Sequence, residues 1–127
     1  MKLASIDVGL KRIGLAICLA SNIVTPQSAI LRKNRDQAAR DVNAFLKEWE
    51  IEKLIVGFPS ANEEVQRRIQ HFVSLLDLSI PYEFCEENMS SIEAEDLIKG
   101  EIKYKRDGRV DSLAAKIILE RFLAKKS

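Results

Sequence analysis

The hydrophobic pattern of this chain changes its period after about residue 35, and this change constrains the fold more than any other feature. Before it, short apolar runs are separated by turn residues, which is typical of strands joined by tight turns, with Pro26 expected in a turn. After it, segments with apolar residues three and four positions apart alternate with short continuous apolar runs, which predicts helices between buried strands. The expected strands cover residues 2–8, 13–20, 28–32, 53–59 and 80–87, and the expected helices cover residues 36–50, 62–76, 90–99 and 110–124.

The order of these segments predicts how the strands pair. Strands joined by tight turns are antiparallel, whereas strands separated by helices are parallel. We therefore expect an α/β fold with a mixed five-stranded sheet, in the order βββαβαβαα, and with helices on both faces of the sheet. Because the chain has 127 residues and shows no linker or repeat, we expect residues 1–127 to form a single domain.

Composition narrows the class of protein. Twenty Lys and Arg residues against nineteen Asp and Glu residues give a net charge of +1, so any surface for nucleic acid has to be local. The sequence has neither a leader pattern nor an apolar run of about 18 residues, so we expect a cytoplasmic protein with no membrane partner. Cys18 and Cys85 each lie in an apolar run and are expected to be buried thiols, which fits a reducing compartment.

Acidic residues fall where the expected strands and the last helix reach one edge of the sheet. They are Asp7 near the end of the first strand, Glu86 and Glu87 at the end of the fifth, and Asp111 in the first turn of the last helix. Ligands of such sheets bind beyond the carboxyl ends of strands, and carboxylates suit Mg²⁺, which can activate water for phosphodiester displacement. From spacing alone, each acid also has a structural explanation: backbone hydrogen bonds for Asp7, the helix dipole for Asp111 and a solvated strand end for the glutamates.

Four motifs occur together in a specific order. They are "IDVGLKRIGLAIC", "LIVGFP", "EENMSSIEAE" and "RVDSLAAKIIL". Over nearly the whole chain, this set resembles the YqgF/RuvX family, whose pattern runs I-D-x-G-x-K-R-I-G-x-A, V-V-G-L-P, D-E-R-L-[ST]-T-x-E-A and V-D-x-x-A-A-x-x-[IL]-L. The resemblance implies an RNase H-like fold of the Holliday junction resolvase type and a metal-dependent nuclease, with a role in maturing the 5′ end of pre-16S rRNA.

The resemblance also implies a catalytic site. Asp7, Glu87 and Asp111 match the family's acids, which implies that they are both the catalytic residues and the ligands of Mg²⁺, with Mn²⁺ as an alternative ion. Glu86 stands where the family has aspartate, and the choice between it and Glu87 as ligand is open. Asn88 stands where the family has arginine, so this chain lacks one guanidinium that would suit a phosphate.

Basic residues near the acids predict contacts with a phosphate backbone. Lys11 and Arg12 match the family's basic pair in the turn after the first strand. Lys105 and Arg109 belong to a basic loop that ends just before Asp111. Such side chains bind backbone phosphates without reading the base sequence. Without the motif, both groups also have the ordinary explanation of solvated surface charge.

The sequence leaves several functions open. The expected partner is nucleic acid, with structured RNA favoured by the resemblance and branched DNA as the alternative, for which a resolvase would need a symmetric pair of sites. We expect a monomer or a weak homodimer. A catalytically weakened nucleic-acid-binding module also fits. An ATP-handling protein is a further alternative, because "IDVG" also resembles the phosphate-binding hairpin of actin-like and sugar-kinase folds, but those enzymes need two such lobes and 127 residues supply only one. A histidine-based triad is not expected, since His71 is the only histidine and has no nucleophile near it in sequence.

Overall fold

The computed structural model describes residues 1–86 and 109–126. Its elements are β1 (Leu3–Val8), β2 (Arg12–Cys18), β3 (Thr25–Leu31), α1 (Arg35–Glu48), β4 (Lys53–Phe58), α2 (Glu63–Ser74), β5 (Tyr82–Glu86) and α4 (Arg109–Lys126). Each strand and helix expected within these ranges is present. The helix predicted over residues 90–99 lies outside the described residues.

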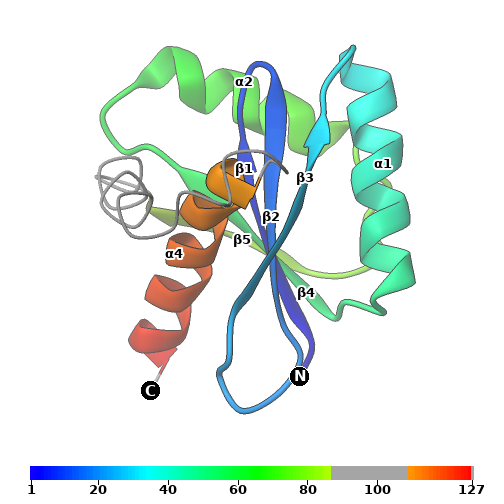
Figure 1. Cartoon of the computed structure of the whole chain (residues 1–127). Helices are drawn as coiled ribbons and strands as arrows, with labels where there is room; N and C mark the ends of the chain where they lie inside the picture. The colour runs from blue at the N-terminus through cyan, green and yellow to red at the C-terminus, as the bar shows by residue number, and fades with distance from the viewer. Residues whose placement is uncertain (87–108, 127) are drawn as a thin grey trace.

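The strands form one mixed sheet in the order β3-β2-β1-β4-β5 (Figure 1). β1 pairs antiparallel with β2, and β2 pairs antiparallel with β3. β1 and β4 are parallel, as are β4 and β5. The predicted mixed five-stranded α/β sheet is therefore confirmed, including which neighbours are parallel.

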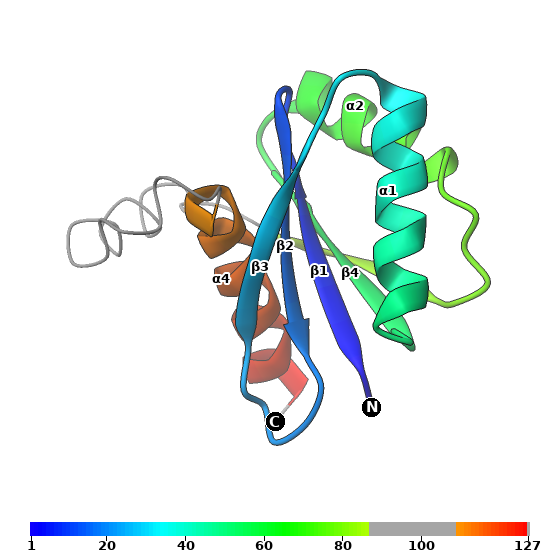
Figure 2. The ribbon, with the colours of Figure 1, turned by 45° about the vertical axis from the view of Figure 1, so that its right-hand side comes forward.

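Helices cover both faces of the sheet, with α1 and α2 on one side and α4 on the other (Figure 2). The side chains of a strand alternate between the two faces, and β1 shows this clearly. Ala4 and Ile6 belong to the core under α1 and α2, whereas Leu3 belongs to the core under α4. Ser5 also faces α4, because its hydroxyl bonds the carbonyl oxygen of Ala115.

The starts of α1 and α2 are fixed by asparagine caps. The backbone N–H of Gln37 donates to Asn34 Oδ1 at 2.8 Å, and the Gln37 side chain accepts from the Asn34 backbone, which completes a capping box. In α2, the backbone N–H of Val65 donates to Asn62 Oδ1 at 3.1 Å. These caps satisfy backbone donors that a helix leaves unpaired at its first turn.

β3 differs from its expected bounds. It begins at Thr25, and Pro26 lies within the strand opposite Ala16, so the prediction of a turn at Pro26 is wrong. β3 is an edge strand, and a proline is tolerated there because its missing N–H need not face a partner strand. The sequence does not reveal which strand is at the edge.

Cys18 and Cys85 are both buried and free, as predicted. Burial raises the pKa of the Cys85 thiol, and its sulfur lies 3.7 Å from the carbonyl oxygen of Ile118 in α4. Over the described residues, no helix combines the length and the apolar character that a membrane span requires.

Candidate active site

Asp7 lies near the carboxyl end of β1 and is half-buried. It is two residues from Ser5, so the alternation of the strand places both on the face covered by α4. On the neighbouring strand β2, the residue opposite Asp7 is Gly14. Because glycine has no side chain, nothing from that position of β2 fills the space beside the carboxylate.

The first turn of α4 is anchored next to this pair. The backbone N–H of Leu15 donates to Ser112 Oγ at 3.1 Å, and both Leu15 and Ser112 are buried. The register between β2 and β3 shifts between Ile13 and Leu15, so the ladder is irregular at this point. One helical turn further on, Ser5 Oγ donates to the carbonyl oxygen of Ala115 at 2.6 Å. Two hydroxyl groups thus hold α4 across β1 and β2.

This anchoring brings together two of the predicted acidic positions. Asp111 precedes Ser112 in α4, and Gly14 precedes Leu15 in β2. The backbone of Asp111 is therefore held close to the Asp7–Gly14 pair, although the two acids are 104 positions apart in the sequence. Glu87, the third predicted ligand, lies outside the described residues, and for Asp111 only the helical backbone is described. Among the described side chains, no three potential ligands form a metal-binding group.

Glu86 is placed on the other face of the sheet. In the register of β4 and β5 it lies opposite Phe58, and Phe58 packs on Phe84 with ring centroids 4.6 Å apart in the core under α1 and α2. Its carboxylate accepts a hydrogen bond from Ser60 Oγ at 2.9 Å. Asp7 faces α4, so Asp7 and Glu86 lie on opposite faces of the sheet. This arrangement does not suit a metal ion held by both carboxylates.

The predicted basic pair lies where the tight turn after β1 leads into β2, with Lys11 in the turn and Arg12 as the first residue of β2. Lys11 and Arg12 are exposed there, and the turn is closed by a hydrogen bond from the Gly9 N–H to the Arg12 carbonyl oxygen at 3.0 Å. A Cβ atom on Gly9 would lie 2.6 Å from that oxygen, so only glycine fits without a backbone shift. The turn begins directly after β1, which puts its cations at the end of the sheet where Asp7 lies.

The second predicted basic group is only partly described. Lys105 lies outside the described residues, and Arg109 begins the backbone of α4. The sequence reasoning missed Ser112, which fixes α4 on the sheet, and Ser60, which binds Glu86. A serine inside an apolar helical run was the available signal for Ser112, because a buried hydroxyl needs a partner.

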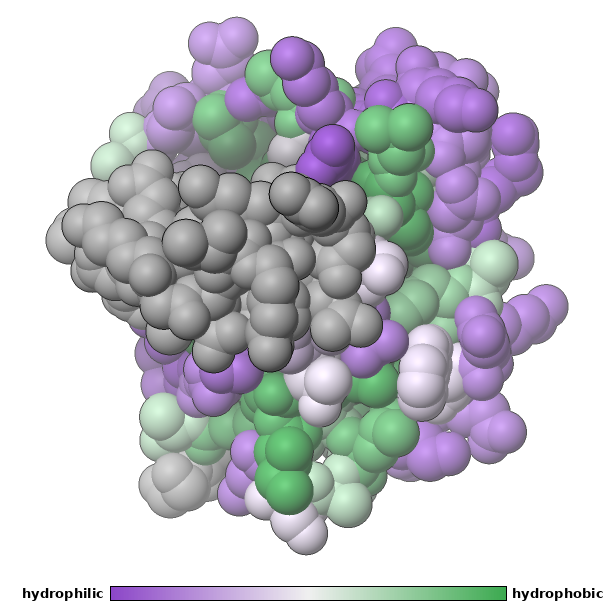
Figure 3. All heavy atoms as spheres, in the orientation of Figure 1, coloured by the Kyte–Doolittle hydropathy of each residue, from purple (hydrophilic) through white to green (hydrophobic). Residues whose placement is uncertain are grey.

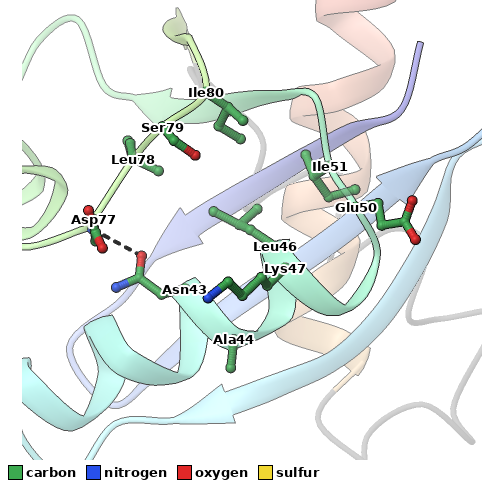
Figure 4. A pocket seen from close by; sticks show the side chains of 10 residues that line it. All are labelled: Asn43, Ala44, Leu46, Lys47, Glu50, Ile51, Asp77, Leu78, Ser79 and Ile80. Carbon is green, nitrogen blue, oxygen red and sulfur yellow. Dashed lines mark hydrogen bonds between the residues drawn. The ribbon is translucent and has the colours of Figure 1, made fainter.

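A cavity of about 560 Å³ lies away from Asp7 and the first turn of α4 (Figure 4). It is formed by the end of α1 and the segment 77–80, where the Asp77 N–H donates to Asn43 Oδ1 at 3.1 Å. Ile51 lines this cavity, and the next residue, Glu52, bonds through its backbone N–H to the carbonyl oxygen of Lys2. Lys2 precedes β1 and Asp7 lies near its end, so this cavity is not part of the candidate site.

The sheet order, with Asp7 at the end of β1 beside the first turn of α4, defines an α/β domain of the RNase H-like class. One similar solved structure is the RuvC protein of T. thermophilus in complex with a Holliday junction substrate, with a TM-score of 0.58 and 14% identity over 99% of this chain and 96% of that chain. Residues 1–125 match the RuvX family, described as Holliday junction resolvase, and the chain belongs to this family.

Two relatives share much more of the sequence. A protein of Sulfurovum sp. (strain NBC37-1) named "Putative pre-16S rRNA nuclease" is 64% identical, over 98% of this chain and 99% of the relative. A protein of the same name from Sulfurimonas denitrificans is 51% identical, over 99% of each.

Proposed function

We propose that this protein is a metal-dependent endonuclease that hydrolyses phosphodiester bonds in structured RNA, at the 5′ end of pre-16S rRNA. One observation carries the proposal: Asp7 lies at the end of β1, opposite Gly14, beneath the first turn of α4 that contains Asp111. Membership of the RuvX family supports the nuclease activity, and the names of the relatives support the RNA substrate.

The chemistry of the donor set fits a hard divalent cation. Asp7 and Asp111 provide carboxylates from two segments that the fold holds close, and Glu87 would complete the set from the chain that follows β5. These three residues would hold Mg²⁺ or Mn²⁺, because such ions prefer oxygen ligands. When bound, the ion supplies positive charge at the phosphate and lowers the pKa of water.

The remaining groups of the site act on the nucleic acid itself. Lys11 and Arg12 extend from the turn beside Asp7, so they can bind phosphates on either side of the bond to be cleaved. Lys105 and Arg109 belong to the segment that leads into Asp111 and would bind the backbone there. Contacts of this kind orient the scissile phosphate without selecting a base sequence.

A second candidate substrate is the four-way DNA junction, which the family description favours. Resolving a junction requires two sites that cut opposed strands, so it requires a symmetric dimer. A monomer can trim one RNA strand. Solution mass measured together with cleavage of both substrates separates the RNA reaction from junction resolution.

We place the reaction in the cytoplasm, in keeping with the two free cysteines.

The test replaces Asp7 with asparagine, which keeps the shape of the side chain and removes its charge. Asp7→Asn is expected to lower Mg²⁺-dependent cleavage of precursor RNA by at least about 100-fold, because several kcal/mol of charge stabilisation are lost. Asp36→Asn is the matched control, because Asp36 is an exposed acid in the first turn of α1. Unchanged cleavage by pure Asp7→Asn protein would contradict the proposal.

Calorimetry separates the enzyme from a binding module. We expect Mg²⁺ or Mn²⁺ to bind the wild-type protein, and we expect Asp7→Asn and Asp111→Ala to weaken this binding strongly. If wild-type protein binds RNA but neither metal, the catalytically weakened nucleic-acid-binding module is the correct function.

A further inference from the structure

A group of arginines lies between α1 and α2, on the opposite face of the sheet from Asp7. Arg32 follows β3, Arg35 begins α1, and Arg67 and Arg68 lie in α2. Together with Glu64 and His71, they line a cavity of about 440 Å³, which we call the arginine cavity. No sequence motif marks it, because its residues come from two segments, 32–35 and 64–71, that are separate in the sequence.

The arginine cavity carries excess positive charge. Four arginines face one acid, Glu64, which leaves a formal charge of +3 with His71 neutral. Over residues 1–86 and 109–126, none of these arginines forms an ion pair with a described carboxylate. Burial, followed by the positive charges of Arg35 and Arg68, lowers the pKa of Arg32. Like charges held this close repel one another, so an anion bound between them would be stabilised.

Arg32 is held in a fixed position. Its Nη1 donates to the carbonyl oxygen of Gly9 at 2.8 Å, and its backbone N–H donates to that of Lys11 at 2.8 Å. Its guanidinium also lies over the ring of Phe72, 5.6 Å from the ring centroid. A guanidinium that is already ordered loses little conformational entropy when it binds a ligand.

The contacts of Arg32 connect the arginine cavity to the candidate active site. Gly9 and Lys11 belong to the turn between β1 and β2, and only Val8 separates this turn from Asp7. In Figures 1 and 2, this turn, the connection from β3 to α1, and α2 lie at the same end of the molecule. Hydrophilic side chains gather over the first turns of α1 at this end (Figure 3). Basic residues at this end of the molecule therefore run from Lys11 and Arg12 to Arg67 and Arg68 in α2, with the acids Asp36, Glu63 and Glu64 among them.

We infer that the arginine cavity binds backbone phosphates of the nucleic-acid substrate outside the cleavage site, an inference that rests on the proposed function. One guanidinium group can donate two parallel hydrogen bonds to the oxygens of a phosphate. Arginines on two facing segments can therefore hold consecutive phosphates of one strand. The lining contains no Phe, Tyr or Trp, and His71 is its one aromatic side chain. Most of its hydrogen-bond donors are guanidinium groups, which suit phosphate oxygens, so we assign the cavity to the backbone of the strand and not to its bases. The cavity makes long substrates bind more tightly than short ones.

The test uses the double variant Arg67→Gln/Arg68→Gln, because both side chains are exposed and neither belongs to the buried residues of α2, which are Ile69, Phe72 and Val73. Binding to a long precursor RNA is measured over a range of salt concentrations. Loss of two phosphate contacts is expected to reduce the slope of log K against log salt by about 1.4. Affinity for the long RNA should fall at least about tenfold at low salt, which follows from the same two contacts. Cleavage of a short RNA that spans only the cleavage site should keep its kcat/KM.

The matched control is Lys47→Gln/Lys125→Gln, which removes two exposed cations at the far ends of α1 and α4. An equal loss of RNA affinity in the control, or an unchanged salt slope in the arginine variant, overturns the inference. The inference is also overturned if inorganic phosphate or ATP binds the wild-type protein and competes fully with long RNA, because the cavity would then be a site for a free anion. If the arginine variant loses RNA binding while the wild-type protein cleaves nothing, the inference stands and the proposed nuclease function fails.

Discussion

The two faces of the sheet are built differently. The face under α1 and α2 has a continuous core of apolar side chains from all five strands and both helices. The face under α4 has a smaller core and contains the two buried polar residues among the described side chains, Ser5 and Ser112. Asp7 and Gly14 lie on this second face. One face thus provides most of the apolar burial, and the other positions the candidate site.

This difference has a physical basis. Apolar burial is non-directional, so it stabilises a helix on a sheet without fixing its position along the strands. A hydrogen bond from a hydroxyl to a backbone group has a defined length and angle. Ser112 and Ser5 therefore hold α4 at one position over β1 and β2, which an apolar contact alone does not ensure. A site that combines Asp7 with Asp111 requires that position to be fixed.

The largest effect is expected on the apolar face. Leu54 in β4 is fully buried in the core under α1 and α2. Leu54→Ala should lower the free energy of unfolding by about 2–5 kcal/mol, because it removes apolar burial and leaves a cavity. Denaturant unfolding measures this change, and Ile23→Ala, at a residue that is 68% exposed, is the control. A loss no larger than that of the control would show that this core does not dominate stability.

The next effect is expected at the anchor of α4. Ser112→Ala leaves the buried N–H of Leu15 without its hydroxyl partner and should cost about 1–3 kcal/mol. It should also lower cleavage more than its effect on stability explains, because the first turn of α4 is no longer fixed next to Asp7. Cleavage is measured at a temperature where the variant remains folded. Reduced stability with normal cleavage would separate the anchor from the site.

Much of this architecture can be predicted from the sequence. The change in period after the third strand correctly predicts which strands are antiparallel, which are parallel, and that helices cover both faces. This works because strand and helix periods are local properties. The start of β3 is predicted wrongly, since tolerance of Pro26 depends on the strand being at an edge. That is a property of the assembled sheet.

The candidate site is predictable only in part. Asp7 and Asp111 belong to motifs, so the sequence identifies both positions, although their roles stay predictions. Ser112 lies beside Asp111, but its partner is the N–H of Leu15, 97 positions away, and only the folded chain brings them together. Arg32 and Arg68 are ordinary surface charges in the sequence until β3, α1 and α2 place them around one cavity.

A smaller effect is expected at the second hydroxyl of the α4 face. Ser5→Ala removes a donor from the carbonyl oxygen of Ala115, which lies inside α4. A helical carbonyl can also accept from the N–H four residues later, so we expect a loss of about 0.5–1.5 kcal/mol, less than for Ser112→Ala. Denaturant unfolding of both single variants tests this order. A larger loss for Ser5→Ala would assign the main anchor of α4 to β1 instead of β2.

The smallest effect is a pH dependence confined to the α4 face. The pKa of Cys85 is raised by burial, so above the ordinary thiol pKa the unfolded chain releases a proton that the folded chain retains. The stability should therefore fall as the pH rises through this window, by no more than about 1.4 kcal/mol per pH unit for one group. In Cys85→Ala this part of the slope disappears, whereas Leu54→Ala should lower stability equally at all pH values, because it neither adds nor removes a titratable group. Denaturant unfolding at pH values below and above the thiol pKa measures the slope. An unchanged slope in Cys85→Ala would show that the thiol is not what makes this face sensitive to pH.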